Sequence, residues 1–137
     1  YAAIFIYNHI SIQLEHLDYT VLTDEKWFCF VLEQILSNAL KYTKQGSVKI
    51  SAEETENGLQ IFVKDTGIGI KREDLPRIFE KGFTGYNGRN DKKATGLGLN
   101  LCRKAAEHLN VGIAVESKPG VGSCFTLDLK ERQFNIE

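Results

Sequence analysis

The order of the predicted elements gives an α/β fold with one β-sheet and three helices in a single domain. Apolar residues recur with a period of about 3.6 residues in segments 28–42 and 101–109, a pattern typical of amphipathic helices. They alternate with polar residues in segments 48–52 and 59–63, a pattern typical of half-buried strands. The length of 137 residues, 42% of them hydrophobic and 26% charged, suits one globular domain with its own core.

The first third of the chain predicts two extended segments and a long helix. Residues 10–14 alternate as a strand, and residues 19–22 form a second extended piece. Thr23 and Asp24 follow as a helix cap, and the apolar stripe of the helix ends near Tyr42. This is the best-defined helix in the sequence.

The middle of the chain predicts an antiparallel hairpin. Its two alternating segments are joined at Asn57 and Gly58, a dipeptide that favours tight hairpin turns. The second strand runs directly into the segment DTGIGI at residues 65–70, after which residues 75–79 suggest a short helix with Pro76 in its first turn.

The last third predicts a loop, a helix and two strands. Residues 82–95 are polar, contain glycines and lack periodicity, so we expect a mobile loop with a lid at residues 85–93. A second amphipathic helix opens at the segment GLG, and residues 113–116 and 124–129 predict two final strands.

Composition excludes several classes of protein. The formal net charge of −1 gives no long-range attraction for nucleic acid, so no nucleic-acid partner is expected. Cys29, Cys102 and Cys124 form no CxxC pair, which argues against a disulfide framework and a zinc site and favours a reducing cytosol. No apolar run approaches the roughly 20 residues that span a bilayer, and the apolar residues 2–6 are too few for a signal sequence.

Polar residues on the first long helix form the first candidate site. Gln34, Asn38, Lys41 and Tyr42 follow one another at spacings of four, three and one, so they share a flank beside the apolar stripe. By itself, this pattern is more often a solvated polar face.

The segment Asp65-x-Gly67-x-Gly69 is the second candidate site. It leaves a buried strand, where an acidic residue costs free energy unless it has a partner, and its glycines allow a ligand to approach the backbone. The simpler interpretation is a turn between a strand and a helix.

The segment Gly96-Leu97-Gly98 is the third candidate site, because it opens the second helix with free backbone N–H groups and a positive dipole end that suit phosphate. Basic residues in the preceding loop could cover an anion, although charged loops are usually only solvated. No GxxxxGK[ST] segment is present and neither GxG segment is completed to GxGxxG, which excludes the two best-known phosphate-binding motifs. The basic residues are Arg89, Lys92 and Lys93.

The order of these motifs resembles the catalytic domain of bacterial sensor histidine kinases. The match runs through EQILSNALKYT, DTGIGI, IFEKGF, TGLGL and a final Gly-Ser turn, which resemble the family's N, G1, F and G2 boxes and last turn. The resemblance extends over about residues 21–129, and LTDEKW at residues 22–27 is most similar to membrane-sensing kinases of Gram-positive bacteria. The matched segments are residues 33–43, 65–70, 78–83, 95–99 and 122–123.

This resemblance implies a two-layer α/β sandwich of the Bergerat type, with a mixed sheet covered on one face by three helices and ATP bound between helices and lid. The whole of residues 1–137 would be one catalytic ATP-binding domain, and residues 1–20 would include the lead-in from a dimerisation region. The superfamily also includes gyrase, mismatch-repair and heat-shock chaperone ATPases.

The resemblance also implies roles for individual residues. Asn38 would hold Mg²⁺ against the phosphates of ATP, Lys41 would neutralise phosphate charge, and Tyr42 would pack beside adenine. Asp65 would accept a hydrogen bond from the exocyclic amine of adenine, directly and through a water that Ser123 helps to fix.

The remaining boxes would surround the nucleotide. The G1 glycines and Ile70 would lie along it, the F-box phenylalanines would shape the base of the lid, Lys81 would reach the terminal phosphate, and the G2 box would cradle the phosphates. These residues are Gly67, Gly69, Ile70, Phe79, Lys81, Phe83, Gly96, Leu97 and Gly98.

The sequence departs from the family at one metal position. The family usually has asparagine four residues before Asn38, where this chain has Gln34, so a metal role for Gln34 is a weaker expectation. The superfamily ATPases have a glutamate there that activates water, which Gln34 cannot do. Glu33 is acidic but lies about 100° around the helix, so transfer is favoured over hydrolysis.

No catalytic residue is evident within the chain, because the family's phospho-acceptor motif is missing. His9, His16 and His108 lack its surroundings, so we expect the acceptor histidine on a separate dimerisation domain. The leading hypothesis is therefore an ATP-dependent histidine kinase of two-component signalling.

Further expectations follow from the family for the whole protein. They are a homodimer, a cognate response regulator and a cytoplasmic position on a membrane-anchored protein. A nucleotide-sensing module without phosphotransfer and an ATPase of the gyrase or chaperone branch remain the alternatives.

Overall fold

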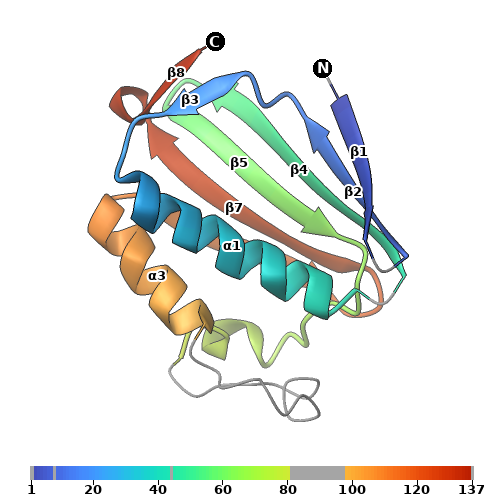
Figure 1. The fold of residues 1–137 in the computed structure, drawn as a ribbon. Helices are drawn as coiled ribbons and strands as arrows, with labels where there is room; N and C mark the ends of the chain where they lie inside the picture. The colour runs from blue at the N-terminus through green and yellow to red at the C-terminus, as the bar shows by residue number, and fades with distance from the viewer. Residues whose placement is uncertain (1, 8, 44, 81–97, 137) are drawn as a thin grey trace.

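A six-stranded sheet with helices on one face forms the body of the domain (Figure 1). The structure is a computed structural model that describes residues 2–7, 9–43, 45–80 and 98–136. Within it the strands run in the order β1-β2-β4-β5-β7-β6, and β2 and β4 pair in parallel while every other neighbouring pair is antiparallel. The predicted mixed sheet is confirmed. Its strands are β1 Ala2–Tyr7, β2 Ile10–Glu15, β4 Gly46–Thr55, β5 Gly58–Asp65, β6 Gly112–Lys118 and β7 Gly122–Lys130.

A second, two-stranded sheet corrects the prediction of a single sheet. Strand β3 (Tyr19–Val21) pairs antiparallel with β8 (Phe134–Ile136), near the C-terminus. The two strands are far apart in the sequence, so no local pattern indicates that they pair. Gln133 supports the junction, since its side chain donates to Leu109 O at 2.8 Å and accepts from Lys130 N at 2.8 Å.

The two α-helices form as their apolar stripes predict. Helix α1 (Glu25–Lys41) begins after Asp24, whose carboxylate accepts a hydrogen bond from Trp27 N at 3.2 Å, which confirms the predicted cap. Helix α3 (Gly98–Leu109) packs against α1 and crosses it in the opposite direction. No helix in the described part of the chain is long and apolar enough to cross a membrane.

The third predicted helix is not confirmed, because the described residues hold only two α-helices. Residues Leu75–Arg77 form a single 3-10 turn, labelled η1. Arg77 N donates to Asp74 O, and Glu80 N donates to Arg77 O, so these bonds span three residues as in a 3-10 turn. Pro76 has no N–H and therefore starts a turn without extending a ladder.

Strand β1 was not predicted, because its six residues AAIFIY are apolar without alternation. It pairs with β2 through a tight turn that includes His9 at φ 65°. The lead-in expected at the start of the chain therefore includes an edge strand of the sheet, at the far side from β6.

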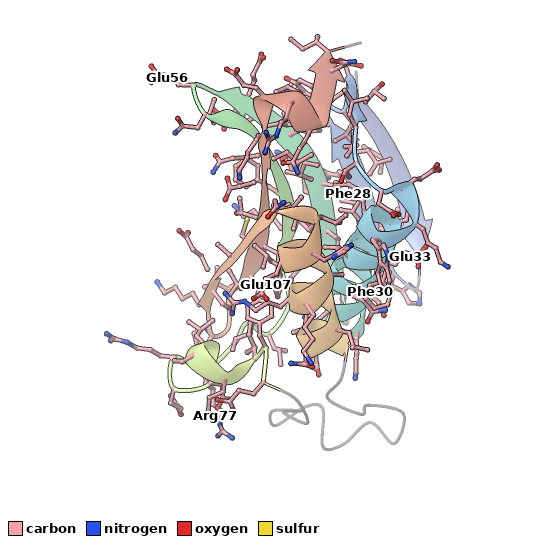
Figure 2. The ribbon with its side chains drawn as sticks, turned by 90° about the vertical axis from the view of Figure 1, so that its left-hand side faces the viewer. Phe28, Phe30, Glu33, Glu56, Arg77 and Glu107 are labelled. Atoms are coloured by element: carbon pink, nitrogen blue, oxygen red, sulfur yellow. The ribbon has the colours of Figure 1, made fainter. Side chains whose placement is uncertain are left out.

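The core lies between the sheet and the helices. Leu59, Ile61 and Val63 of β5 face Leu129, Leu127 and Phe125 of β7 on the inner side, and all six are buried. Helix α1 covers this face with Phe28, Val31, Ile35 and Ala39. Figure 2 shows Glu56 of the β4–β5 turn and Arg77 of η1 at opposite ends of the domain.

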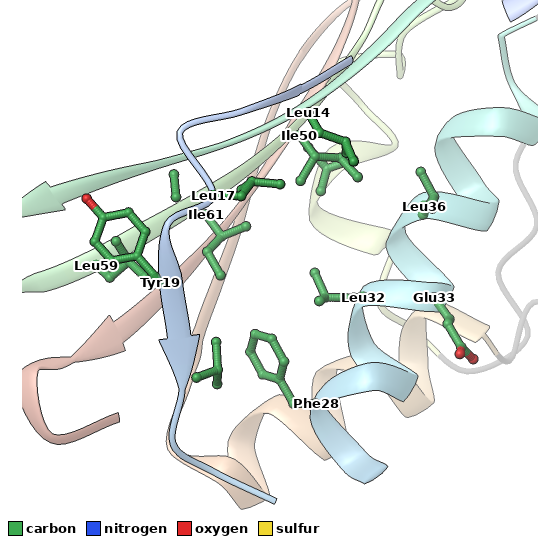
Figure 3. A pocket seen from close by; sticks show the side chains of 13 residues that line it. Leu14, Leu17, Tyr19, Phe28, Leu32, Glu33, Leu36, Ile50, Leu59 and Ile61 are labelled. Carbon is green, nitrogen blue, oxygen red and sulfur yellow. The ribbon is translucent and has the colours of Figure 1, made fainter. Parts of the chain in front are cut away.

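An apolar cavity of about 340 Å³ lies between α1 and strands β2, β4 and β5 (Figure 3). Leu32 and Leu36 line it from the helix, and Leu14 and Ile50 line it from the sheet. At about 100° per residue, these leucines lie on the flank of α1 opposite to Asn38. The cavity is therefore separate from the polar flank that the sequence singled out.

Candidate functional site

The register of two strands brings Asp65 and Ser123 together. They are directly opposite each other in the β5–β7 pair, on the inner face, and are 5% and 8% exposed. One carboxylate oxygen, Asp65 Oδ1, accepts from Ser123 N at 3.2 Å and from Gly67 N at 2.9 Å. Two positions 58 residues apart thus form one buried polar unit at the end of the sheet.

Burial raises the pKa of Asp65 above its ordinary value of 3.8, and the two backbone hydrogen bonds oppose that rise. No ion pair with Asp65 occurs among the described residues, and its second oxygen receives no hydrogen bond from them. An ionised carboxylate buried in this way favours a ligand that brings hydrogen-bond donors.

The glycines of the loop after Asp65 are required by contacts within the chain. A Cβ on Gly67 would lie 2.8 Å from Thr43 Oγ1 and would collide with the carbonyl oxygen of Tyr42. Gly69 has φ +75°, and a side chain there would meet the backbone of Lys118. The structure therefore supplies a reason for these glycines in addition to the predicted approach of a ligand.

A hydrogen-bond network ties this loop to the β6–β7 hairpin. Ser117 Oγ accepts from Ile70 N at 2.7 Å, donates to Gly122 O at 3.0 Å and lies 2.7 Å from Ser123 Oγ. No sequence pattern singles out Ser117, because its role depends on the register of β6 against β7. The network holds Ile70 and Ser123 in fixed positions around Asp65.

The loop is tied to α1 as well. Tyr42 ends the helix, and its carbonyl oxygen accepts from Ile68 N at 3.2 Å. The arrowhead of β5 accordingly lies beside the C-terminal end of α1 (Figure 1). Lys41 is exposed, with its ammonium 5.4 Å from the centre of the Tyr42 ring.

The polar flank of α1 meets the start of α3. A Cβ on Gly98 would lie 2.6 Å from Gln34 Oε1, so the glutamine amide is in contact with the first residue of α3. Asn38 lies one turn further along the same flank and is half-buried. The amide oxygens of α1 and the positive end of α3 therefore border the same region.

Phe79 is held between α3 and β7. Its ring makes an edge-to-face contact with Phe125 at 6.4 Å, and the Arg103 guanidinium lies 4.5 Å from its centre. Asn100 Nδ2 donates to Phe79 O at 3.1 Å. The start of the predicted F box is thus anchored to the helix that follows the loop.

Several predicted site residues lie outside the described residues. They are Lys81, Phe83, Gly96, Leu97 and the predicted lid at residues 82–95 with its basic side chains.

Thr43 is a candidate site residue that the sequence did not single out. It follows α1 directly, is 2% exposed, and its hydroxyl has no hydrogen-bond partner within the described part of the chain. An unpaired buried hydroxyl costs about 1–3 kcal/mol. Thr43 lies within one of the matched boxes, but its burial and lack of a partner are properties of the folded chain only.

The described residues contain no cluster of three or more histidine, cysteine, aspartate or glutamate side chains that could hold a metal. Asn38 and Gln34 instead offer amide oxygens one turn apart on α1. Oxygen ligands suit Mg²⁺, which proteins commonly bind through one or two groups together with substrate phosphates. The donor set therefore fits Mg²⁺ bound together with a nucleotide.

Comparison with known families agrees with this geometry. The family described as histidine kinase-, DNA gyrase B- and HSP90-like ATPase matches residues 23–133. The chain belongs to this ATPase family. That range includes both described helices, the Asp65 loop and the Asp65–Ser123 pair.

Curated relatives of the chain include sensor kinases. It is 45% identical over 117 residues to sensor protein BceS of Bacillus subtilis, covering 85% of this chain and 34% of that protein. It is 39% identical over 111 residues to sensor protein kinase GraS of Staphylococcus aureus, covering 81% of this chain and 32% of that protein. The chain thus spans about a third of each relative. The predicted resemblance to sensor kinases of Gram-positive bacteria is confirmed.

Solved structures share the fold. The catalytic domain of histidine kinase ThkA matches with a TM-score of 0.71 at 28% identity, covering 86% of this chain and 78% of that one. Full-length ShkA in complex with AMPPNP matches with a TM-score of 0.71 at 26% identity, covering 87% and 24%. Mycobacterial MprB gives a TM-score of 0.77 at 20% identity, covering 91% and 84%, which supports the fold alone.

Proposed function

We propose that this domain binds Mg²⁺-ATP and transfers the γ-phosphoryl group to a histidine outside residues 1–137, as the catalytic part of a sensor histidine kinase. The observation that supports this best is the buried Asp65 carboxylate, held by two backbone N–H groups near the C-terminal end of α1. The polar flank of the same helix meets the start of α3 through Gln34.

Asp65 selects the base. Adenine presents an exocyclic amine, which donates, where guanine presents a carbonyl, which accepts. A buried carboxylate pairs with the amine, and guanine would leave it facing a second acceptor at a cost of about 1–3 kcal/mol. Tyr42 is half-buried next to the Asp65 loop, where it packs beside the base, while the Gly67–Ile70 backbone borders the same space.

The phosphates lie toward the other end of the site. Asn38 and Gln34 would hold Mg²⁺, Lys41 would offset phosphate charge, and the N-terminus of α3 at Gly98 would add its positive dipole end. When bound, Mg²⁺ supplies charge neutralisation for the transferred group. Lys81, Phe83, Gly96 and Leu97 complete this half of the proposed site.

Transfer is favoured over hydrolysis because Gln34 occupies the position of a water-activating glutamate and cannot accept a proton. In the proposed reaction, a nitrogen of the acceptor imidazole forms the N–P bond. The bond from the γ-phosphorus to its bridging oxygen breaks, and ADP leaves with that electron pair. The domain contributes position and charge, which are the main requirements of phosphoryl transfer.

The histidines within the chain do not fit the acceptor role. His9 and His16 are exposed in turns of the N-terminal strands. His108 lies ten residues from Gly98 along α3, about 15 Å at the usual helical rise, and its ring contacts Trp27. The acceptor therefore belongs to a dimerisation domain. The proposal also includes a homodimer, a cognate response regulator and a cytoplasmic position of this domain on a membrane-anchored protein.

The test is phosphorylation of the full-length protein with γ-labelled ATP, with an Asp65→Asn variant as the control. We expect an acid-labile phosphohistidine in the wild type that is strongly reduced in the variant. Rapid phosphate release without a phosphoprotein would instead support a superfamily ATPase. ATP binding with neither product would support a nucleotide-sensing module.

A further inference from the structure

Thr43 has a buried hydroxyl that the proposed chemistry leaves unused. Its Oγ1 has no hydrogen-bond partner within the described part of the chain, and the residue is 2% exposed. Buried polar atoms are nearly always paired in folded proteins, so such an atom indicates a partner that is supplied on binding.

The Thr43 hydroxyl and the Asp65 carboxylate both lie against Gly67. The position that a Cβ would take on Gly67 is 2.8 Å from Thr43 Oγ1 and 3.0 Å from Asp65 Oδ1. The two oxygens therefore lie on the same side of the Gly67 backbone. They are no farther apart than these two distances added together, which is within the span of one bridging water molecule.

The hydroxyl groups around Asp65 differ in whether they have a hydrogen left to donate. Ser117 donates its only hydroxyl hydrogen to Gly122 O, since a carbonyl can only accept. Ser123 must therefore be the donor in the 2.7 Å contact with Ser117. The Ser123 oxygen can then only accept further hydrogen bonds. Asp65 as a carboxylate also only accepts. Among these groups, Thr43 is the one with a hydrogen still to donate.

We propose that Thr43 is a specificity-determining residue of the adenine site, whose hydroxyl donates to a water that in turn donates to Asp65 and to N1 of adenine. This inference rests on the proposed function. A water that accepts a hydrogen bond from Thr43 can donate both of its hydrogens, so it pairs with N1 of adenine, which is an acceptor. In guanine N1 carries a hydrogen and is a donor, so it would face a hydrogen of this water.

The test is a thermodynamic cycle that removes the Thr43 hydroxyl from the protein and N1 from the adenine ring, separately and together. Binding of ATP and of 1-deaza-ATP, which has C–H in place of N1, is measured by calorimetry for wild type and Thr43→Val. We expect wild type to prefer ATP, and Thr43→Val to weaken ATP binding about five- to twentyfold while changing 1-deaza-ATP binding less than twofold. Thr43→Ser retains the hydroxyl and should bind ATP as wild type does.

Thermal unfolding without nucleotide separates this role from a structural one. Replacing an unpaired hydroxyl with a methyl group should leave the melting temperature unchanged or raise it, whereas loss of a structural hydrogen bond would lower it. Thr126→Val, on the outer face of β7, is the matched control and should affect neither nucleotide. Thr43→Ala allows the same cycle if Thr43→Val does not fold.

Equal weakening of both nucleotides, or no weakening of ATP, would overturn the role of Thr43 while leaving the proposed function intact. A wild-type protein that binds neither nucleotide would overturn the proposed function and this inference together.

Discussion

At the scale of single residues, the site depends on a few buried polar groups whose partners lie far away in the sequence. Asp65 receives two backbone hydrogen bonds, and Ser117 fixes the hydroxyl of Ser123. Thr43 keeps a donor that the described residues do not use. Because these groups are shielded from water, each one would impose a strict requirement on a ligand bound in the proposed site.

Replacing Asp65 with asparagine tests the base-recognition role of the carboxylate. Asp65→Asn keeps the shape but can turn an NH₂ group toward the amine of adenine, so ATP affinity should fall by about ten- to a hundredfold. Titration calorimetry measures this, and Asp128→Asn on the exposed face of β7 is the control. An unchanged affinity in Asp65→Asn would rule out the adenine assignment.

The raised pKa of Asp65 gives a pH dependence with a defined sign. In the folded state this carboxyl binds its proton more tightly than in the unfolded chain, so it favours folding at low pH. That contribution is lost as the pH rises from near 3.8 through the raised folded pKa. ATP needs the ionised form, so affinity should rise over the same interval.

The pH prediction is tested by difference, since other carboxylates titrate nearby. Urea unfolding and ATP binding are measured from acid to neutral pH for wild type and Asp65→Asn. The change in unfolding free energy and in ATP affinity that is due to Asp65 should appear in wild type and be absent from the variant. Parallel pH curves for the two proteins would contradict it.

At the scale of the elements, α1 is the organising element of the domain. One flank packs on the sheet, the flank with Gln34 and Asn38 meets the start of α3, and the third borders the apolar cavity. Its Asp24 cap and its apolar stripe are local features, and the sequence predicted both. The contact of Gln34 with Gly98 was not predictable, because it depends on how two helices pack.

Truncation of Ile35 tests how much the packing of α1 contributes. This side chain is 0% exposed, so Ile35→Ala should reduce the free energy of unfolding by about 2–5 kcal/mol. The exposed neighbour Glu33, changed to alanine, should alter it by less than about 0.5 kcal/mol. Chemical denaturation of both variants measures the difference, and similar values for the two would show that α1 is not packed as described.

At the scale of the whole molecule, the two ends of the chain contribute differently. Strand β1 is an edge strand on the side of the sheet away from β7, and the matched family range begins only at residue 23. The C-terminal segment instead joins α3, β7 and β3 through Gln133 and Leu22.

Two truncations test this asymmetry. Removing residues 1–8 should leave ATP affinity within about twofold of wild type, because β1 is an edge strand that pairs with β2 and precedes the matched family range. Removing residues 131–137 should lower the melting temperature by several degrees, because it unpairs the Leu109 carbonyl at the end of α3 and opens the β3–β8 sheet. Thermal unfolding and calorimetry on both truncations check this, and a large loss of affinity without β1 would contradict it.

The sequence by itself determined the α/β class, the capped helix α1, the β4–β5 hairpin, the family and the candidate residues from Gln34 to Ser123. These follow from periods of about 3.6 and 2 residues and from motifs whose spacing is local. Only the tertiary structure decided that β1 and the β3–β8 sheet exist, that η1 is a single turn, and that Asp65 pairs with Ser123. It also decided that the buried Thr43 hydroxyl has no partner among the described residues. These features depend on strand register and burial, which are set by segments far apart in the chain and leave no local pattern.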